Sequence, residues 1–185
     1  MEGTPKMADS NITKKALAAS LKELMKDTPF AKISVGDICE RCEMNRKSFY
    51  YHFKDKFDLV NWIYYNEFAR TALKNDYASS WDFIRDICDY FYEQRDFYRK
   101  VLKISGQNSF SEYFTELLLN VFTESFKDLF ADDPNHEFYA GFIANSFVSA
   151  IIRWLTEKDC MPSEEFVSLL KSCVIKTAEK MMESR

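Results

Sequence analysis

The chain has 185 residues, enough for one large domain or two small ones, and 46% of them are hydrophobic, with only four glycines and four prolines. This composition favours long helices packed on one another, and no stretch of about 18 apolar residues is free of charge, so the sequence predicts no membrane span. The net charge of −4 argues against nucleic-acid binding by the chain as a whole. However, residues 1–75 carry 13 basic against 10 acidic residues, and residues 76–185 carry 12 against 19, which fits a protein that touches phosphates with one end only.

The N-terminal segment lacks the basic-then-apolar order of a secretion signal, so we expect the protein in the cytoplasm. Residues 1–10 are predicted to form a disordered tail. The first helix is predicted to start near Ser10 or Asn11 and to end by Thr28, because Pro29 disfavours helix in the residue before it.

Residues 33–56, ISVGDICERCEMNRKSFYYHFKDK, hold signals for two short helices with almost nothing between them. Ser34 is a typical N-cap, and Asp37 falls in the first turn, where the helix dipole favours an anion. Asn45 supplies a second N-cap, so a new helix begins at Arg46. Two helices this close must cross at a steep angle, which predicts a helix-turn-helix.

The second of these helices opens with cationic and hydrogen-bonding side chains, and its following residues are mostly aromatic. Arg46 can bond bidentately to guanine, and Lys47 can reach guanine or phosphate. Asn45 and Ser48 can bond to base edges or phosphate. The alternative for Arg46 is a free surface arginine. A cationic front with an aromatic back suits a helix whose N-terminal end enters a DNA major groove.

The run MNRKSFYYHFKDKFDLV resembles the DNA-binding signature of the TetR/AcrR family of bacterial transcription regulators, and the resemblance covers Ile12 to Val60. It implies an all-α protein with a three-helix DNA-binding domain over 11–55 and a helical effector-sensing and dimerisation domain over 56–185. It also implies that Tyr50, Tyr51 and Lys56 hold the phosphate backbone. The predicted DNA-binding set is Ser34, Asn45, Arg46, Lys47, Ser48, Tyr50, Tyr51 and Lys56.

Two residues depart from the family pattern. Glu43 stands in the turn where the family usually has glycine, and a non-glycine residue with positive φ costs roughly 1 kcal/mol, so we expect a strained or differently shaped turn. Lys47 replaces a small residue and adds charge at a base-facing position. The operator sequence therefore cannot be taken from a relative.

The remaining two-thirds of the chain keep a helical pattern. We expect a linking helix from Lys56 to about Asn75 and body helices that follow it. Predicted body helices cover 81–91, 97–104, 110–131, 138–157 and the segment after Pro162, with breaks at 106–109 and 132–135. The last two carry continuous apolar stripes, with small residues in the first of them, and the resemblance implies that they pair two subunits in a homodimer. The alternative is that both stripes cover their own subunit's core.

The regulatory input has two predicted forms. Phe91, Tyr98, Phe114 and Trp154 could line an apolar pocket for a small-molecule effector, although core packing is the other role open to each. The segment YEQRDFYRKVLKISGQNSFSEYF resembles the regulators of dihydroxyacetone kinase operons. That resemblance implies an activator controlled by a protein co-regulator instead of a directly bound ligand.

Other function classes have less support in the sequence. No Ser/His/Asp or Cys/His set and no glycine-rich phosphate loop are present, so we expect no enzyme, cofactor or metal site. Cys39 and Cys42 form a C-x-x-C that lacks a second Cys or His pair for zinc, and a thiol oxidoreductase built on this pair is the one enzymatic alternative. Their other interpretation is reduced, partly buried packing residues. A helical interaction module without DNA binding is the remaining alternative.

Overall fold

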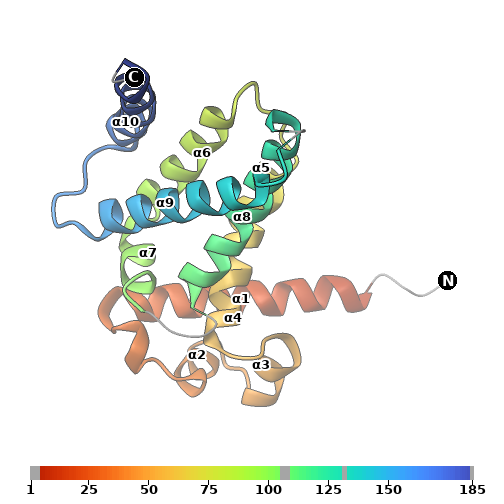
Figure 1. Cartoon of the computed structure of the whole chain (residues 1–185). Coiled ribbons are helices and arrows are strands. Elements are labelled where there is room, and N and C mark those ends of the chain that lie inside the picture. Colours follow the sequence, from red (N-terminus) through yellow and green to blue (C-terminus); the bar gives the residue numbers. More distant parts are fainter. Residues whose placement is uncertain (1–4, 105–108, 131–132, 184–185) are drawn as a thin grey trace.

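The computed structural model describes residues 5–104, 109–130 and 133–183, and within these ranges every regular element is a helix (Figure 1). The prediction of an all-α chain is confirmed. In chain order the elements are α1 (Pro5–Asp27), the 3-10 turn η1 (Phe30–Lys32), α2 (Val35–Arg41), α3 (Arg46–His52), α4 (Lys56–Tyr64), the π-helical stretch η2 (Tyr65–Ala69), α5 (Arg70–Ala72), α6 (Ser80–Glu93), α7 (Arg95–Val101), α8 (Phe110–Leu129), α9 (His136–Thr156) and α10 (Ser163–Glu183).

The first helix is longer than the sequence indicated. α1 begins at Pro5, so residues 5–10 of the predicted tail are helical, and only 1–4 lie outside the described residues. Proline is favoured at the first helical position because its fixed φ suits the helix and its missing N–H would have no partner there. The helix ends at Asp27, two residues before Pro29, as predicted.

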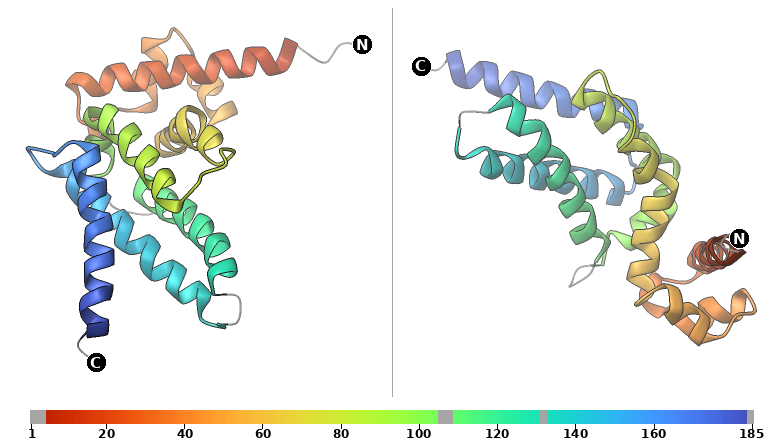
Figure 2. Two further views of the ribbon diagram at one scale, coloured as in Figure 1. Left: turned by 90° about the horizontal axis from the view of Figure 1, so that it is seen from above. Right: turned by 90° about the vertical axis from the view of Figure 1, so that its right-hand side faces the viewer.

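The linker between the two parts of the molecule is the predicted helix from Lys56, but it is not regular. The α-helix α4 changes at Tyr65 into η2 and returns to α-helical geometry for α5, which ends at Ala72. α4 rises from the end of the molecule that holds α2 and α3, and it passes α1 on its way to the body (Figures 1 and 2). We call α1 to α3 the head and α6 to α10 the body.

The body is built around α8 and α9, which lie side by side and pack along each other more extensively than any other pair of described elements. Ala140 and Ala144 of α9 are fully buried, and a Cβ added to Gly141 would lie 3.9 Å from Leu119 of α8. These small residues therefore allow close approach to the subunit's own α8, whereas the sequence suggested a close approach between subunits. The break predicted at 106–109 lies largely outside the described residues, as does Asp132 of the second break.

The two apolar stripes of α9 and α10 divide between the core and the surface. Phe147, Ile151 and Trp154 of α9 and Phe166 of α10 are buried, with Trp154 and Phe166 stacked at 4.3 Å. A second set of large apolar side chains is exposed on the same helices. This set comprises Phe138 and Phe142 of α9 and Leu169, Val174, Ile175, Met181 and Met182 of α10. α10 packs mainly along α6, at the end of the molecule opposite α2 and α3 (Figure 2).

Among the described residues one helix, α9, has the length and composition to cross a membrane. One face of α9 packs against α8, and elsewhere on the helix the polar side chains of Asn145, Ser146 and Ser149 are exposed. The packing accounts for its apolar character as a core helix of a helical bundle.

Candidate DNA interface

Helix α2 starts with two reciprocal hydrogen bonds. The Ser34 backbone N–H donates to the Asp37 carboxylate at 2.7 Å, and the Asp37 N–H donates to Ser34 Oγ at 3.2 Å, which is a capping box. The hydrogen bond from the Ser34 backbone N–H to the carboxylate is the first cause that lowers the pKa of Asp37 below its usual value. Ser34 is thus an exposed residue at the helix start, and its hydroxyl already serves the cap.

The turn between α2 and α3 keeps the shape that glycine normally permits. Glu43 has a φ of 55°. The Met44 N–H donates to the Cys39 carbonyl at 2.9 Å, and the Glu43 N–H donates to the Glu40 carbonyl at 3.2 Å. This pair of bonds is the Schellman motif, in which the residue after the C-cap adopts left-handed geometry. The sequence predicted either a strained or a differently shaped turn at Glu43. The structure shows the strained one, because Glu43 adopts the left-handed geometry of a glycine.

Helix α3 separates its two faces as predicted. Asn45 caps it by accepting the Ser48 N–H at 2.8 Å, and Ser48 Oγ bonds to the same Asn45 oxygen at 3.2 Å. Phe49 is fully buried, and the C-cap residue Phe53 is almost so. The exposed face holds Arg46, Lys47, Tyr50 and Tyr51.

Tyr50 and Tyr51 are 59% and 82% exposed, which leaves both hydroxyls at the surface. Tyr50 places its ring edge-to-face on Phe49 at 5.5 Å, and Tyr51 does the same on His52 at 4.9 Å. Both rings are therefore supported from the helix's own side chains, and neither is needed to close the core. This arrangement suits tyrosines that donate hydrogen bonds to phosphates.

Lys56 is oriented differently from the other predicted contacts. Its ammonium donates to the carbonyls of Phe30 at 2.8 Å, Ile33 at 2.7 Å and Ala31 at 3.4 Å, and it lies 4.5 Å from the Phe30 ring centroid. Partial burial lowers the pKa of this ammonium. In this structure the ammonium closes the 3-10 turn η1, so a phosphate would compete with three carbonyls for it.

Sequence reasoning missed Gly36, whose Cα lies under the guanidinium of Arg46. The available signal was a glycine in the first turn of a helix, where its flexibility is unfavourable. The sequence also gave no sign of the contacts that tie the head to the body.

Those head-to-body contacts form a chain of hydrogen bonds. Lys22 of α1 donates to the Glu67 carboxylate in η2 at 2.5 and 2.8 Å, and Tyr90 of α6 donates to the same carboxylate at 3.0 Å. The Tyr90 hydroxyl is also 2.9 Å from that of Tyr98 in α7. Separately, the Lys100 ammonium of α7 donates to the last carbonyls of α1, those of residues 25 and 26. We call this set of contacts the seam.

Three of the four predicted effector residues lie together, and the fourth does not. Phe91, Tyr98 and Phe114 are fully buried, with ring centroids 4.9 Å apart for Phe91 and Tyr98 and 5.1 Å apart for Phe91 and Phe114. Tyr64 of α4 packs against all three rings, and its buried hydroxyl has no hydrogen-bond partner among the residues that the structure describes. Trp154 lies in a different stack, between Tyr92 and Phe166.

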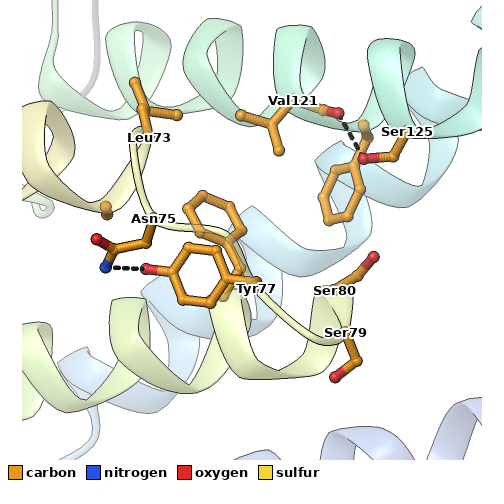
Figure 3. A pocket seen from close by; sticks show the side chains of 10 residues that line it. Leu73, Asn75, Tyr77, Ser79, Ser80, Val121 and Ser125 are labelled. Carbon is orange, nitrogen blue, oxygen red and sulfur yellow. Dashed lines mark hydrogen bonds between the residues drawn. The ribbon is translucent and has the colours of Figure 1, made fainter.

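Two surface cavities are lined by none of these four residues. One of about 580 Å³ lies between α1 and α7 beside the seam, lined by Lys22, Lys26 and Lys100 together with acidic side chains. Another, of about 250 Å³, lies between the end of α5 and α8 (Figure 3). In it Asn75 donates to the Tyr77 hydroxyl across the opening from Val121 and Ser125.

The C-x-x-C pair shows no sign of an activated thiol. Cys39 is buried, which raises its pKa, whereas reactive cysteines have lowered values. The Cys42 thiol donates to the carbonyls of Ile38 and Cys39 at 3.3 and 3.5 Å. Within the described part of the chain, no three His, Cys, Asp or Glu side chains are grouped so as to hold a metal ion.

Two family descriptions match this chain, one for each part of the molecule. "Bacterial regulatory proteins, tetR family" matches residues 17–63, and "Transcriptional regulator C-terminal region", which is also a TetR-type region, matches residues 79–176. Among curated proteins the chain is similar to the HTH-type dhaKLM operon transcriptional activator DhaS of Lactococcus lactis, with 28% identity over 143 residues, 77% of this chain and 74% of that protein.

Two solved structures share the fold. "Dihydroxyacetone kinase operon activator DhaS" has a TM-score of 0.64 at 24% identity, covering 87% of this chain and 95% of that one. A TetR transcriptional regulator from Streptococcus agalactiae has a TM-score of 0.66 at 20% identity, covering 89% and 94%. The head with its capped α2 and α3, the helical body and the two matched regions lead to one conclusion: the chain belongs to the TetR family of bacterial transcriptional regulators.

Proposed function

We propose that this protein acts in the cytoplasm as a homodimer and reads an operator in double-stranded DNA with α3. The observation that carries the proposal is the division of α3. Arg46 and Lys47 are exposed at its N-terminal end, while Phe49 and Phe53 anchor it from behind. A helix held in this way can enter a major groove without uncovering the core. The mildly basic N-terminal third and the acidic body would orient the approach.

The exposed apolar side chains of α9 and α10, which we call the apolar face, support the homodimer. Phe138 and Phe142 are 72% and 64% exposed in the single chain, and Leu169 and Val174 of α10 are exposed as well. An apolar surface of this kind marks an interaction site in a soluble protein. A two-fold pairing through it would place two heads on two half-sites about one helical turn of DNA apart.

DNA reading is tested with labelled DNA from immediately upstream of the protein's own gene, across a salt series. We expect selective binding that strengthens as the salt concentration falls, and an Arg46→Ala, Lys47→Ala variant that loses the selectivity. Lys158→Ala, which removes an exposed lysine between α9 and α10, is the matched control and should bind as the unmodified protein does. Binding that is equally weak to all sequences would support an interaction module instead.

The homodimer is tested by sedimentation at micromolar concentration. The unmodified protein should sediment as a dimer, and Phe142→Asp should shift it toward monomer by placing a charge in the apolar face. Lys158→Asp changes charge outside that face and should remain dimeric. A monomeric unmodified protein would contradict the proposal.

The packing of the body favours a second proposal, which concerns the regulatory input. Phe91, Tyr98 and Phe114 fill the interior of the body with rings in contact, so a ligand there would have to displace them. This packing, together with the likeness to an operon activator, supports control by a protein co-regulator and positive regulation of a dihydroxyacetone kinase operon. A small-molecule effector would instead use a cavity such as the one between α1 and α7.

The two inputs are separated by titration. DNA affinity is measured while dihydroxyacetone, and separately a dihydroxyacetone-binding protein encoded near this gene, is added. A ligand or partner regulates only if it binds one head arrangement better than the other. A change in DNA affinity with dihydroxyacetone alone would contradict the co-regulator proposal, whereas a change that requires the protein would support it.

A further inference from the structure

The guanidinium of Arg46 does not extend away from the head but lies against α2. A Cβ placed on Gly36 would be 2.5 Å from Arg46 Nη2 and 3.2 Å from both Cζ and Nε. The guanidinium therefore occupies the volume that any side chain at position 36 would need. Gly36 is the second residue of α2, and its φ is outside the left-handed region, so the backbone alone does not require glycine there.

The surroundings of Gly36 favour a cation at this place. The neighbouring Asp37 carboxylate accepts a hydrogen bond from the Ser34 N–H at 2.7 Å, and, after hydrogen bonding by Ser34, the charge of Arg46 contributes to the low pKa of that carboxyl. Arg46 as a whole is an exposed residue. Its guanidinium thus contacts α2 in a side chain that is otherwise accessible at the surface.

We propose that Gly36 is a specificity-determining residue for operator reading, because its missing side chain seats the Arg46 guanidinium at the junction of α2 and α3. A bidentate bond to guanine needs the planar guanidinium in one orientation, and a seated group loses less side-chain freedom on binding. The pair, and not Arg46 alone, would then decide which base is read. This inference rests on the proposed function of α3 as the reading helix.

The Gly36→Ala variant changes the space beside Gly36 that the Arg46 guanidinium occupies, which we call the seat, without changing the helix backbone. The added Cβ collides with the far end of a flexible side chain, so Arg46 can move while the backbone stays in place. Alanine also favours helix over glycine. The thermal unfolding midpoint should therefore be unchanged or higher, and a lower midpoint would contradict the proposed seat.

The test is selection of binding sites from a random DNA library with the full-length protein. We compare the unmodified protein with Gly36→Ala, Arg46→Ala and the double variant, and use Glu40→Ala, at an exposed position of α2, as the control. The unmodified protein and the control should prefer guanine at one position of each half-site. Arg46→Ala should lose this preference, and Gly36→Ala should lose on the order of 10-fold in selectivity at the same position.

The double variant decides whether the two residues act as a unit. If they do, the double variant selects no worse than Arg46→Ala, because without the guanidinium the seat has no function. Losses that add, or a Gly36→Ala protein that keeps full preference while Arg46→Ala loses it, would overturn the inference. If Arg46→Ala keeps the preference for guanine, the inference about Gly36 and Arg46 is contradicted, while the proposed reading of DNA by α3 is not. If the unmodified protein selects no sequence, the proposed function fails, and the inference fails with it.

Discussion

Replacing Glu43 by glycine should stabilise this protein. Glu43 is held at a φ of 55°, where the side chain of an L-residue is crowded by its own backbone. The two hydrogen bonds of the turn, from Met44 N–H to the Cys39 carbonyl and from Glu43 N–H to the Glu40 carbonyl, use backbone atoms only. They persist in a Glu43→Gly variant, so the change leaves the hydrogen bonds of the turn in place.

The magnitude follows from two opposing terms. An L-residue in left-handed geometry costs roughly 1–2 kcal/mol. Glycine avoids that cost but loses more freedom on folding, about 0.5–1 kcal/mol relative to a residue with a side chain. The net gain in the free energy of unfolding should be about 0.5–1 kcal/mol. For a chain of this size, that corresponds to a rise in the thermal midpoint of roughly 1–4 °C.

Urea unfolding at one fixed protein concentration measures this change. Glu40→Gly is the matched control, because it makes the same chemical change at an exposed helical position of α2, where glycine should cost up to about 1 kcal/mol. Glu43→Ala removes the charge but keeps the strain, and its stability should change little. The reasoning is refuted if Glu43→Gly is no more stable than Glu43→Ala.

Three further predictions concern the head and the linker that joins it to the body. Lys56→Met removes the donor for three backbone carbonyls and should lower the free energy of unfolding by about 1–3 kcal/mol in urea titrations; an unchanged value would contradict the internal role of Lys56. Glu67→Gln weakens the ion pair with Lys22, so stability should fall by at most about 1 kcal/mol, while DNA affinity changes with the same salt slope in binding assays; an altered slope would mean a changed phosphate contact. Burial and the charge of Lys14 lower the pKa of His52, so its contribution to stability is full above the unfolded pKa of about 6.5 and is lost as the pH falls through the lower folded pKa. His52→Gln should therefore flatten the stability profile below pH 6.5, as measured by thermal unfolding in a pH series.

The helices of the head could be predicted because their ends are determined by residues that are close in the sequence. Ser34 and Asn45 are polar caps that act within three residues of chain, and both serve as the sequence indicated. The alternation of exposed and buried residues in α3 likewise needs only the helical period. Even the strain at Glu43 could be predicted, since it depends on one residue type in one turn.

What the sequence could not provide are contacts that depend on distance in space. Lys56 lies 23 or more residues from the carbonyls that bind its ammonium, and no spacing rule connects them. Arg46 has the right residue type for guanine, but its position against Gly36 depends on how α3 crosses α2. A flexible side chain has several orientations open to it, and only its neighbours in the fold select one.

The aromatic residues of the body illustrate the same limit. The four predicted effector residues, Phe91, Tyr98, Phe114 and Trp154, are aromatic, as the lining of an apolar pocket would be. Residue type alone does not distinguish side chains that line a cavity from side chains that fill the core. The answer depends on whether rings from other helices reach the same space. Here Tyr64 of α4 does so, and the rings pack on one another. Trp154 is separated from the other three because it stacks on Phe166 of α10.

The position of Tyr98 connects this packed interior to the head. Its ring belongs to the buried aromatic cluster, and its hydroxyl lies 2.9 Å from Tyr90, which bonds to the same Glu67 carboxylate as Lys22 of α1. A shift of α7 within the body would therefore disturb a hydrogen-bonded chain that ends on the first helix of the head. Any input that controls DNA binding must favour one arrangement of head and body over the other. The seam is where the described structure places polar contacts whose geometry would differ between two such arrangements.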